Sequence, residues 1–194
     1  MKELNEMSLD ELWELFPILL EEHNPQYKIW YEEEKGRILH ALREIPVCRI
    51  NHVGSTAIEG LIAKPTVDIL LELPHTCEMD GVTSRLQSAG WLLMARDDAQ
   101  RTLDMNKGYA KTGYAERVYH LHIKPSGDWD ELYFRDYLQA HPDVARQYET
   151  LKFQLKARYA PDRDAYTNAK SEFVLTYSQK ARREFEGRYL PEGR

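Results

Sequence analysis

The chain has little of what a secreted or membrane protein needs. Its 194 residues include two cysteines, Cys48 and Cys77, and no CxxC spacing, so neither a disulfide scaffold nor a zinc or thiol-exchange motif is expected. The longest apolar stretch, around residues 69–71, is far too short to cross a bilayer. The N-terminal residues carry acids where a secretory signal needs a basic start and an unbroken apolar stretch. We therefore expect a cytoplasmic protein that does not act on a membrane.

Positive charge is also in short supply. The chain has 26 lysines and arginines against 32 acids, a net charge of −6. This balance argues against general nucleic-acid binding, which relies on an excess of basic side chains. The charge is uneven, however, because residues 1–34 hold ten acids and two bases, whereas residues 135–194 hold twelve bases and nine acids. The C-terminal bases are either solvated helix faces or a source of cations for an anionic ligand.

What remains is the composition of an ordinary globular protein. Hydrophobic residues make up 42% of the chain and charged residues 30%, with no low-complexity tract. The length suits a single domain over residues 1–194 with one sizeable core. Neither a GxSxG nor a GxxxxGK[ST] motif occurs, so we expect neither a serine-nucleophile enzyme nor a P-loop kinase.

Hydrophobic periodicity predicts an α+β fold. We expect a mixed sheet of about four to five strands, with a sheet core over about 45–125 and a C-terminal helical segment over about 129–187. Ser8 and Glu11 form a capping-box pattern that predicts a first helix, which Pro17 ends. Strands are predicted at 18–22, 47–53, 66–73, 91–96, 101–105 and 118–124, helical segments at 25–44, 57–63 and 79–89, and three helices after residue 129.

The stretch over residues 51–72, NHVGSTAIEGLIAKPTVDILLE, carries the strongest functional signal. The small residues Gly54, Ser55 and Thr56 would let backbone N–H groups approach an anion closely, although they also suit a plain strand-to-helix turn. Lys64, held by Pro65 just before a buried strand, is placed to balance phosphate charge. The sequence therefore predicts a phosphate-binding turn here.

Asp68 is an acid within an otherwise apolar strand. Burying a carboxylate costs several kcal/mol unless it is paired or binds a metal. Two interpretations stay open, since Asp68 is either a metal ligand close to bound phosphates or the buried partner of a base such as Lys64 or Arg117.

His120 and His122 form the second candidate feature. Residues at i and i+2 of a strand point to the same face, so the two imidazoles could grip one metal ion or one phosphate. The alternative is a pair of half-buried histidines that are satisfied by hydrogen bonds.

Four blocks of sequence together resemble the GrpB family. They are HVGSTAIEGLIAKPTVDILLEL, RVYHLHI, YFRDYLQAHPDVARQYETLK and the later Tyr166 and Lys170, and they run from about residue 15 to 181. The resemblance implies the nucleotidyltransferase-superfamily fold, similar to DNA polymerase beta and to aminoglycoside and tRNA nucleotidyltransferases. It therefore implies a small mixed sheet with flanking helices.

That superfamily has a Gly-Ser turn for the triphosphate, two acids separated by one residue on the next strand, and a third acid on a later strand. Here Gly54 and Ser55 match the turn, and Asp68 matches one of the paired acids. The partner acid is missing, because Leu70 and Thr66 occupy the two positions where it would stand. On the later strand, histidines stand where the third acid would be expected.

The resemblance implies a metal-dependent nucleotidyltransferase that moves a nucleoside monophosphate from a nucleoside triphosphate to a small-molecule acceptor. Asp68, His120 and His122 are expected to be catalytic and to bind a divalent ion, either magnesium or manganese, with zinc as the alternative. Two other functions stay open: a non-catalytic nucleotide-binding or regulatory protein, and a histidine-metal hydrolase on the same fold. The residues expected to bind phosphate are Gly54, Ser55, Thr56, Lys64, Arg117 and Lys170.

Overall fold

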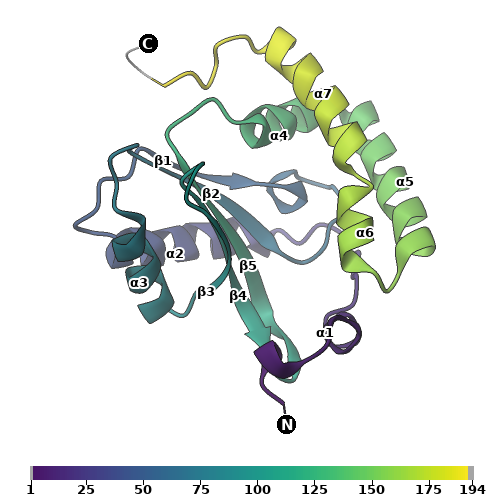
Figure 1. Cartoon of the computed structure of the whole chain (residues 1–194). Helices are drawn as coiled ribbons and strands as arrows, with labels where there is room; N and C mark the ends of the chain where they lie inside the picture. The colour runs from purple at the N-terminus through teal and green to yellow at the C-terminus, as the bar shows by residue number, and fades with distance from the viewer. Residues whose placement is uncertain (1, 192–194) are drawn as a thin grey trace.

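A five-stranded mixed sheet forms the centre of the molecule (Figure 1). We analysed a computed structural model, which describes residues 2–191. Strand β2 pairs in parallel with β5 and antiparallel with β1, and β4 pairs antiparallel with both β5 and β3. The mixed sheet expected from the sequence is thus confirmed. In spatial order the strands are β1 (Arg49–Val53), β2 (Val67–Leu73), β5 (Gly113–Pro125), β4 (Thr102–Ala110) and β3 (Leu92–Asp97).

Helices cover both faces of the sheet (Figure 1). One face packs against α2 (Gln26–Ala41) and α3 (Met79–Ser88). The other lies under the C-terminal helices, which are α4 (Asp130–Ala140), α5 (Pro142–Tyr159), α6 (Arg163–Asn168) and α7 (Ser171–Glu184). The short α1 (Leu9–Leu15) lies near the hairpin end of β4 and β5, and two 3-10 turns cover Leu4–Glu6 and Ser55–Ala57.

Strand β2 shows why the sheet has two buried faces. Val67, Ile69 and Leu71 pack into the core beneath α2 and α3, whereas Leu70 packs with Val53 and Leu132 under the C-terminal helices. Every residue of β2 except Asp68 is buried. The prediction of a strand that is buried on both faces is therefore confirmed, and a single acid interrupts it.

Three predictions differ from the structure. Residues 18–22 form one bridge, from Glu21 to Ala63, instead of a strand. The helical segment predicted at 57–63 does not form, because the 3-10 turn after Gly54 ends at Ala57 and residues 58–63 are not helical. Three predicted C-terminal helices are in fact four.

The hairpin of β4 and β5 is longer than predicted, and Gly108 explains the difference. It lies inside β4 at a register shift, with a positive φ of 92°, and a Cβ there would lie 2.2 Å from the Arg117 carbonyl oxygen. A glycine that permits a bulge has the same sequence signal as one that ends a strand. None of the described helices is long and apolar enough to cross a membrane.

A buried ion pair joins the edge of the sheet to the C-terminal part of the chain. Glu72 on β2 is fully buried and accepts two hydrogen bonds from Arg49 on β1, at 2.6 and 2.8 Å. It also accepts the Gly127 N–H at 3.1 Å, and Arg49 donates to the carbonyl oxygens of Gly127 and Tyr189. Glu72 is therefore fully engaged in holding the fold together.

Replacing Arg49 with methionine should destabilise the protein by about 3 kcal/mol or more, because the Glu72 carboxylate would stay buried without its cation. Urea unfolding of the wild type and the variant measures this loss. The double variant Arg49→Met, Glu72→Leu removes both charges and should recover most of the stability. A loss below about 1 kcal/mol in the single variant would contradict the structural role of the pair.

Candidate functional site

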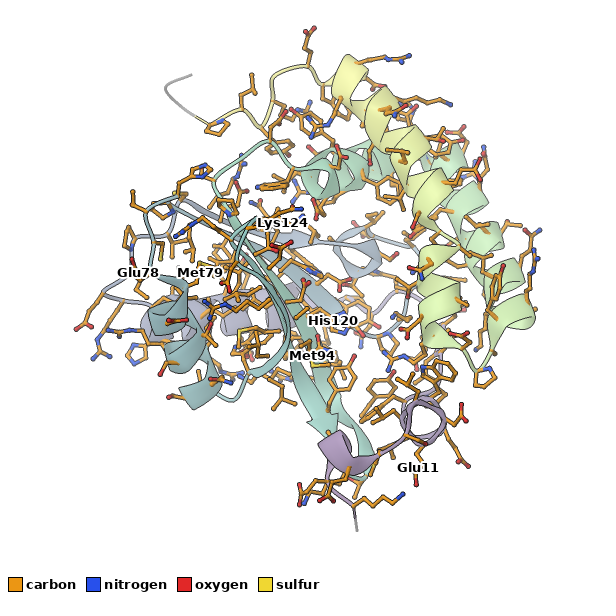
Figure 2. All side chains as sticks on the ribbon, in the orientation of Figure 1. Glu11, Glu78, Met79, Met94, His120 and Lys124 are labelled. Carbon is orange, nitrogen blue, oxygen red and sulfur yellow. The ribbon has the colours of Figure 1, made fainter. Side chains whose placement is uncertain are left out.

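The predicted residues gather in a cleft of about 780 Å³ between the sheet and helices α6 and α7. Gly54 lies at one wall, Asp68, His120 and His122 lie on the sheet, and Lys64 and Lys170 also line the space. Figure 2 shows His120 where the strands face α6. The structure thus brings together six of the predicted site residues from distant parts of the chain.

Gly54 allows the turn to lie directly against Asp68. Its φ of 70° is in the left-handed region, and a Cβ at this position would lie 2.3 Å from Oδ2 of Asp68. Pairing of β1 with β2 places Val53 opposite Asp68, so the turn begins immediately beside the carboxylate. Both the backbone conformation and the close approach therefore require glycine.

A chain of hydrogen bonds links Asp68 to the C-terminal helices. Nδ1 of His120 lies 3.1 Å from Oδ1 of Asp68, and Nε2 of His120 lies 2.7 Å from the Tyr109 hydroxyl. The Tyr109 oxygen accepts a hydrogen bond from Arg163 on α6, at 3.5 Å. Its own proton is then free to go to Nε2, which leaves the imidazole proton on Nδ1, where it donates to Asp68.

The charge states of Asp68 and His120 follow from this arrangement. Burial disfavours an ionised Asp68, but the hydrogen bond from His120 and the nearby positive charges outweigh it and lower the pKa of the carboxyl. Burial also lowers the pKa of His120, against the opposing effect of Asp68. At neutral pH the pair is therefore an ionised carboxylate and a neutral imidazole.

His122 has a separate partner, Asp104 on β4, whose Oδ1 lies 2.7 Å from Nδ1 of the ring. Burial disfavours the charged ring, but the hydrogen bond to Asp104 and the surrounding carboxylates outweigh it and raise the pKa of His122. Sequence reasoning missed Asp104. The signal was the alternation in β4, where Leu103 and Met105 are buried and Asp104 is exposed on the face opposite to theirs.

Three cations face the cleft without a carboxylate partner. Across the described residues 2–191, Lys64, Lys170 and Arg163 form no ion pair within 4.0 Å. Burial lowers the pKa of Lys170 to about 7, and the charges of Lys64 and Lys152 add to the effect. Burial also lowers the pKa of Lys64. Arg163, which lies over the rings of Tyr109 and Tyr114, had no distinguishing signal in the sequence.

Two predicted phosphate-binding residues lie elsewhere. Arg117 is on the face of β5 toward α2, where it pairs with Glu33 at 2.5 Å and lies over the Trp30 ring, so its assignment to the site is wrong. Thr56 is buried, and its hydroxyl donates to the Thr66 carbonyl oxygen at 3.0 Å. It stabilises the turn and lines a separate cavity of about 870 Å³.

Ser55 lines a neighbouring cavity of about 560 Å³ instead of the cleft, and a lysine contacts its hydroxyl. Lys152, which is 3% exposed, donates to Oγ of Ser55 at 3.3 Å and to the Ile62 carbonyl oxygen. Lys152 thus bonds no carboxylate, contrary to the usual expectation for a lysine on a helix. Arg135 pairs with the neighbouring Asp136 at 2.8 Å.

The donor atoms do not fit a two-metal carboxylate site. Leu70 supplies no ligand, both ring nitrogens of His120 are engaged, and Nδ1 of His122 is bonded to Asp104. Within residues 2–191 no three His, Cys, Asp or Glu side chains are grouped so as to hold a metal ion. The prediction that Asp68, His120 and His122 bind a magnesium, manganese or zinc ion thus has no support from the hydrogen bonds of these side chains, and it stays a prediction.

Sequence comparison matches residues 17–180 to a family model described as GrpB protein. A UPF0157 protein of Pseudomonas aeruginosa is 39% identical over 152 residues, which cover 78% of this chain and 62% of that protein. The glutamate-rich protein GrpB of Alkalihalophilus pseudofirmus is 34% identical over 164 residues, covering 81% of this chain and 91% of that one. The chain thus spans less than two thirds of the Pseudomonas relative.

Comparison with solved structures addresses the fold. The GrpB protein of Enterococcus faecalis superposes with a TM-score of 0.75 at 24% identity, over 86% of this chain and 99% of that one. The Cid1 poly(U) polymerase, solved with magnesium and 3′-dATP, gives a TM-score of 0.50 at 9% identity, over 82% of this chain and 51% of that one. The nucleotidyltransferase-like fold expected from the sequence is confirmed.

Replacing Gly54 with alanine should destabilise the protein more than the same change at Gly60. Both glycines have a positive φ, but a Cβ at Gly60 meets nothing within 4 Å. Gly60→Ala should cost about 1–2 kcal/mol from backbone strain alone. Gly54→Ala should cost about 1–3 kcal/mol beyond that, because its Cβ displaces Asp68. Equal losses in urea unfolding would show that the turn does not press on the carboxylate.

Replacing Tyr109 with phenylalanine should raise the pKa of His120, because the hydroxyl that stabilises the neutral ring at Nε2 is lost. Long-range ¹H–¹⁵N NMR reports both the tautomer and the titration. In the wild type the Nδ1–H tautomer is expected. Tyr114→Phe is the control, since the Tyr114 hydroxyl donates to the Pro17 carbonyl oxygen instead. An Nε2–H tautomer in the wild type would refute the hydrogen-bond chain.

Proposed function

The chain belongs to the GrpB family, and we propose that its cleft binds the phosphate groups of a nucleotide-like ligand. The observation that carries the proposal is the group of three unpaired cations, Lys64, Arg163 and Lys170, which face the cleft together. Four acids also line the cleft, but Asp130 and Glu131 are paired with Arg182 and Lys124. Of the other two, Asp68 is hydrogen-bonded to His120 and Asp164 is exposed to solvent. A multiply charged anion would relieve the mutual repulsion of the three cations and restore the protonated form of Lys170.

Neutral donors support the same ligand. Gly54 brings the backbone of the turn to the cleft, and Ser171, the first residue of α7, also lines it. Ser178 is 1% exposed, lines the cleft and has a hydroxyl with no hydrogen-bond partner among the described residues. A buried hydroxyl without a partner favours a ligand that can bond to it.

Nucleotide binding without transfer agrees best with the side chains. Transfer by the two-metal route needs paired carboxylates, and Leu70 occupies the position of the second one. Nucleotidyl transfer to a small-molecule acceptor is the second candidate, favoured by an ionised Asp68 next to the Gly54 turn. The Cid1 likeness concerns the fold, and it makes nucleoside triphosphates the first anions to test.

Replacing Lys170 with methionine should weaken tripolyphosphate binding by about tenfold to a hundredfold, the usual effect of losing a charged hydrogen bond. Isothermal titration calorimetry measures the affinity. Lys180→Met is the matched control, because Lys180 is an exposed lysine on α7 outside the cleft. If the two variants bind equally well, the cleft is not the binding site.

Wild-type affinity for tripolyphosphate should fall as pH rises from about 6 to 9, relative to Lys170→Met. The pKa of Lys170 is about 7 in the free protein, so its ammonium is present below this pH and is lost above it. The Lys170→Met variant corrects for titration of the phosphate itself. A constant ratio of the two affinities across this range would exclude Lys170 as a phosphate contact.

The second candidate is tested by pyrophosphate release from nucleoside triphosphates with magnesium, manganese, zinc or a chelator. Release that requires a metal and is lost in Asp68→Asn would favour transfer over binding alone. Binding that survives in chelator and in Asp68→Asn, with no release, would favour the non-catalytic function.

A further inference from the structure

Large apolar side chains from three separate elements surround the mouth of the cleft. Leu9 on α1 is 60% exposed, Met94 on β3 is 59% exposed and Leu175 on α7 is 55% exposed, and all three line the cavity. Figure 2 shows Met94 near His120, on the side of the sheet that faces α6. Trp13 and Leu12 of α1 complete this apolar rim. We call the group of Lys64, Arg163 and Lys170 the cationic floor. The cleft thus has two chemically different parts, the apolar rim and the cationic floor.

Helix α1 has no buried residue, although its apolar side chains face the cleft. The residue that anchors it is the next one, Phe16, whose ring packs at 4.9 Å against Tyr109 and at 5.1 Å against Tyr114. On the acidic side of the helix, Glu11 pairs with Lys2 at 2.5 Å. The helix therefore holds Trp13 at the mouth of the cleft without using it in the core of the protein.

We propose that the apolar rim binds the base of the nucleotide whose phosphates lie on the cationic floor. This inference rests on the proposed function, because it takes the phosphate position as its starting point. The occupant needs an anionic end for Lys64 and Lys170 and a flat apolar part for Trp13, and a nucleotide has both. A cavity of about 780 Å³ is within the usual size for a small-molecule site.

The apolar rim should distinguish between ligands that carry the same phosphates but differ in whether they have a base. Stacking on an aromatic side chain favours a nucleoside triphosphate over inorganic tripolyphosphate, because tripolyphosphate has no base. The floor contacts are common to both ligands. The rim residues should therefore affect the affinity for nucleotides and leave the affinity for tripolyphosphate unchanged.

The test compares binding of tripolyphosphate and of four nucleoside triphosphates to the wild type and to Trp13→Ala, Trp13→Phe and Phe153→Ala. At least one nucleotide should bind about tenfold or more tightly than tripolyphosphate. Trp13→Ala should lower the affinity for that nucleotide to the affinity for tripolyphosphate. Trp13→Phe should retain most of the wild-type affinity for the nucleotide. Phe153→Ala is the control, because Phe153 is an exposed aromatic residue outside the cleft.

Tryptophan fluorescence gives a second readout. The preferred nucleotide should quench the emission of Trp13, tripolyphosphate should not, and Trp13→Phe should lose the quenching while it still binds. Because no residue of α1 is buried, Trp13→Ala should unfold at the wild-type temperature, which a melting curve checks.

The outcomes separate the two proposals. If tripolyphosphate binds through Lys170 and no nucleotide binds more tightly, the base site is wrong and phosphate binding stands. Nucleotide affinity that is equal in Trp13→Ala and Phe153→Ala overturns the base site in the same way. If neither class of ligand binds, both proposals fall. A wild type that dimerises through the rim, with the dimer lost in Trp13→Ala, would identify a second copy as the occupant and overturn the base site.

Discussion

An ionised carboxylate within an otherwise buried strand is the constraint on which the site depends. Asp68 stays charged because His120, opposite it on β5, donates a hydrogen bond, and because cations lie around it. The register of β2 with β5 creates this contact, since a shift of one residue would turn His120 to the other face. The Gly54 turn, Tyr109 and Arg163 are then arranged around the same pair.

The two acids of β2 have opposite roles because their surroundings differ. Glu72 is enclosed with Arg49 and satisfied on both oxygens, so it contributes to the fold and is closed to ligands. Asp68 lies four residues earlier, where the sheet opens to the cleft and where Lys64, Arg163 and Lys170 form no ion pair among the described residues. Partly desolvated cations that lack a paired carboxylate carry an electrostatic cost, which an anionic ligand would offset.

The departures from a two-metal site are consistent with one another. Leu70 packs into the core with Val53 and Leu132, where a carboxylate would be buried without a partner. His120 directs one nitrogen to Asp68 and the other to Tyr109, so the ring is saturated with hydrogen bonds within the protein. The result is a nucleotidyltransferase-like fold in which, over residues 2–191, Asp68 is the one acid of β2 that lines the cleft and no three His, Cys, Asp or Glu side chains are grouped to hold a metal ion.

The sequence by itself determined where the five strands of the sheet lie, the Gly54 turn, the isolated acid Asp68 and the shared face of His120 and His122, because these depend on periodicity and neighbouring residues. The Ser8 capping box was likewise local, and it is present. The sequence did not give the full length of β4 and β5, and it predicted a strand at 18–22 that is a single bridge. The tertiary structure alone decided the partners. Strand pairing places Asp104 at the site, and helix packing places Arg163 there. Arg117 lies outside the site because the pleat of β5 directs its side chain toward α2. Hydrophobic patterns specify which face of an element is buried, but they do not specify which charged residue of another element will lie opposite it.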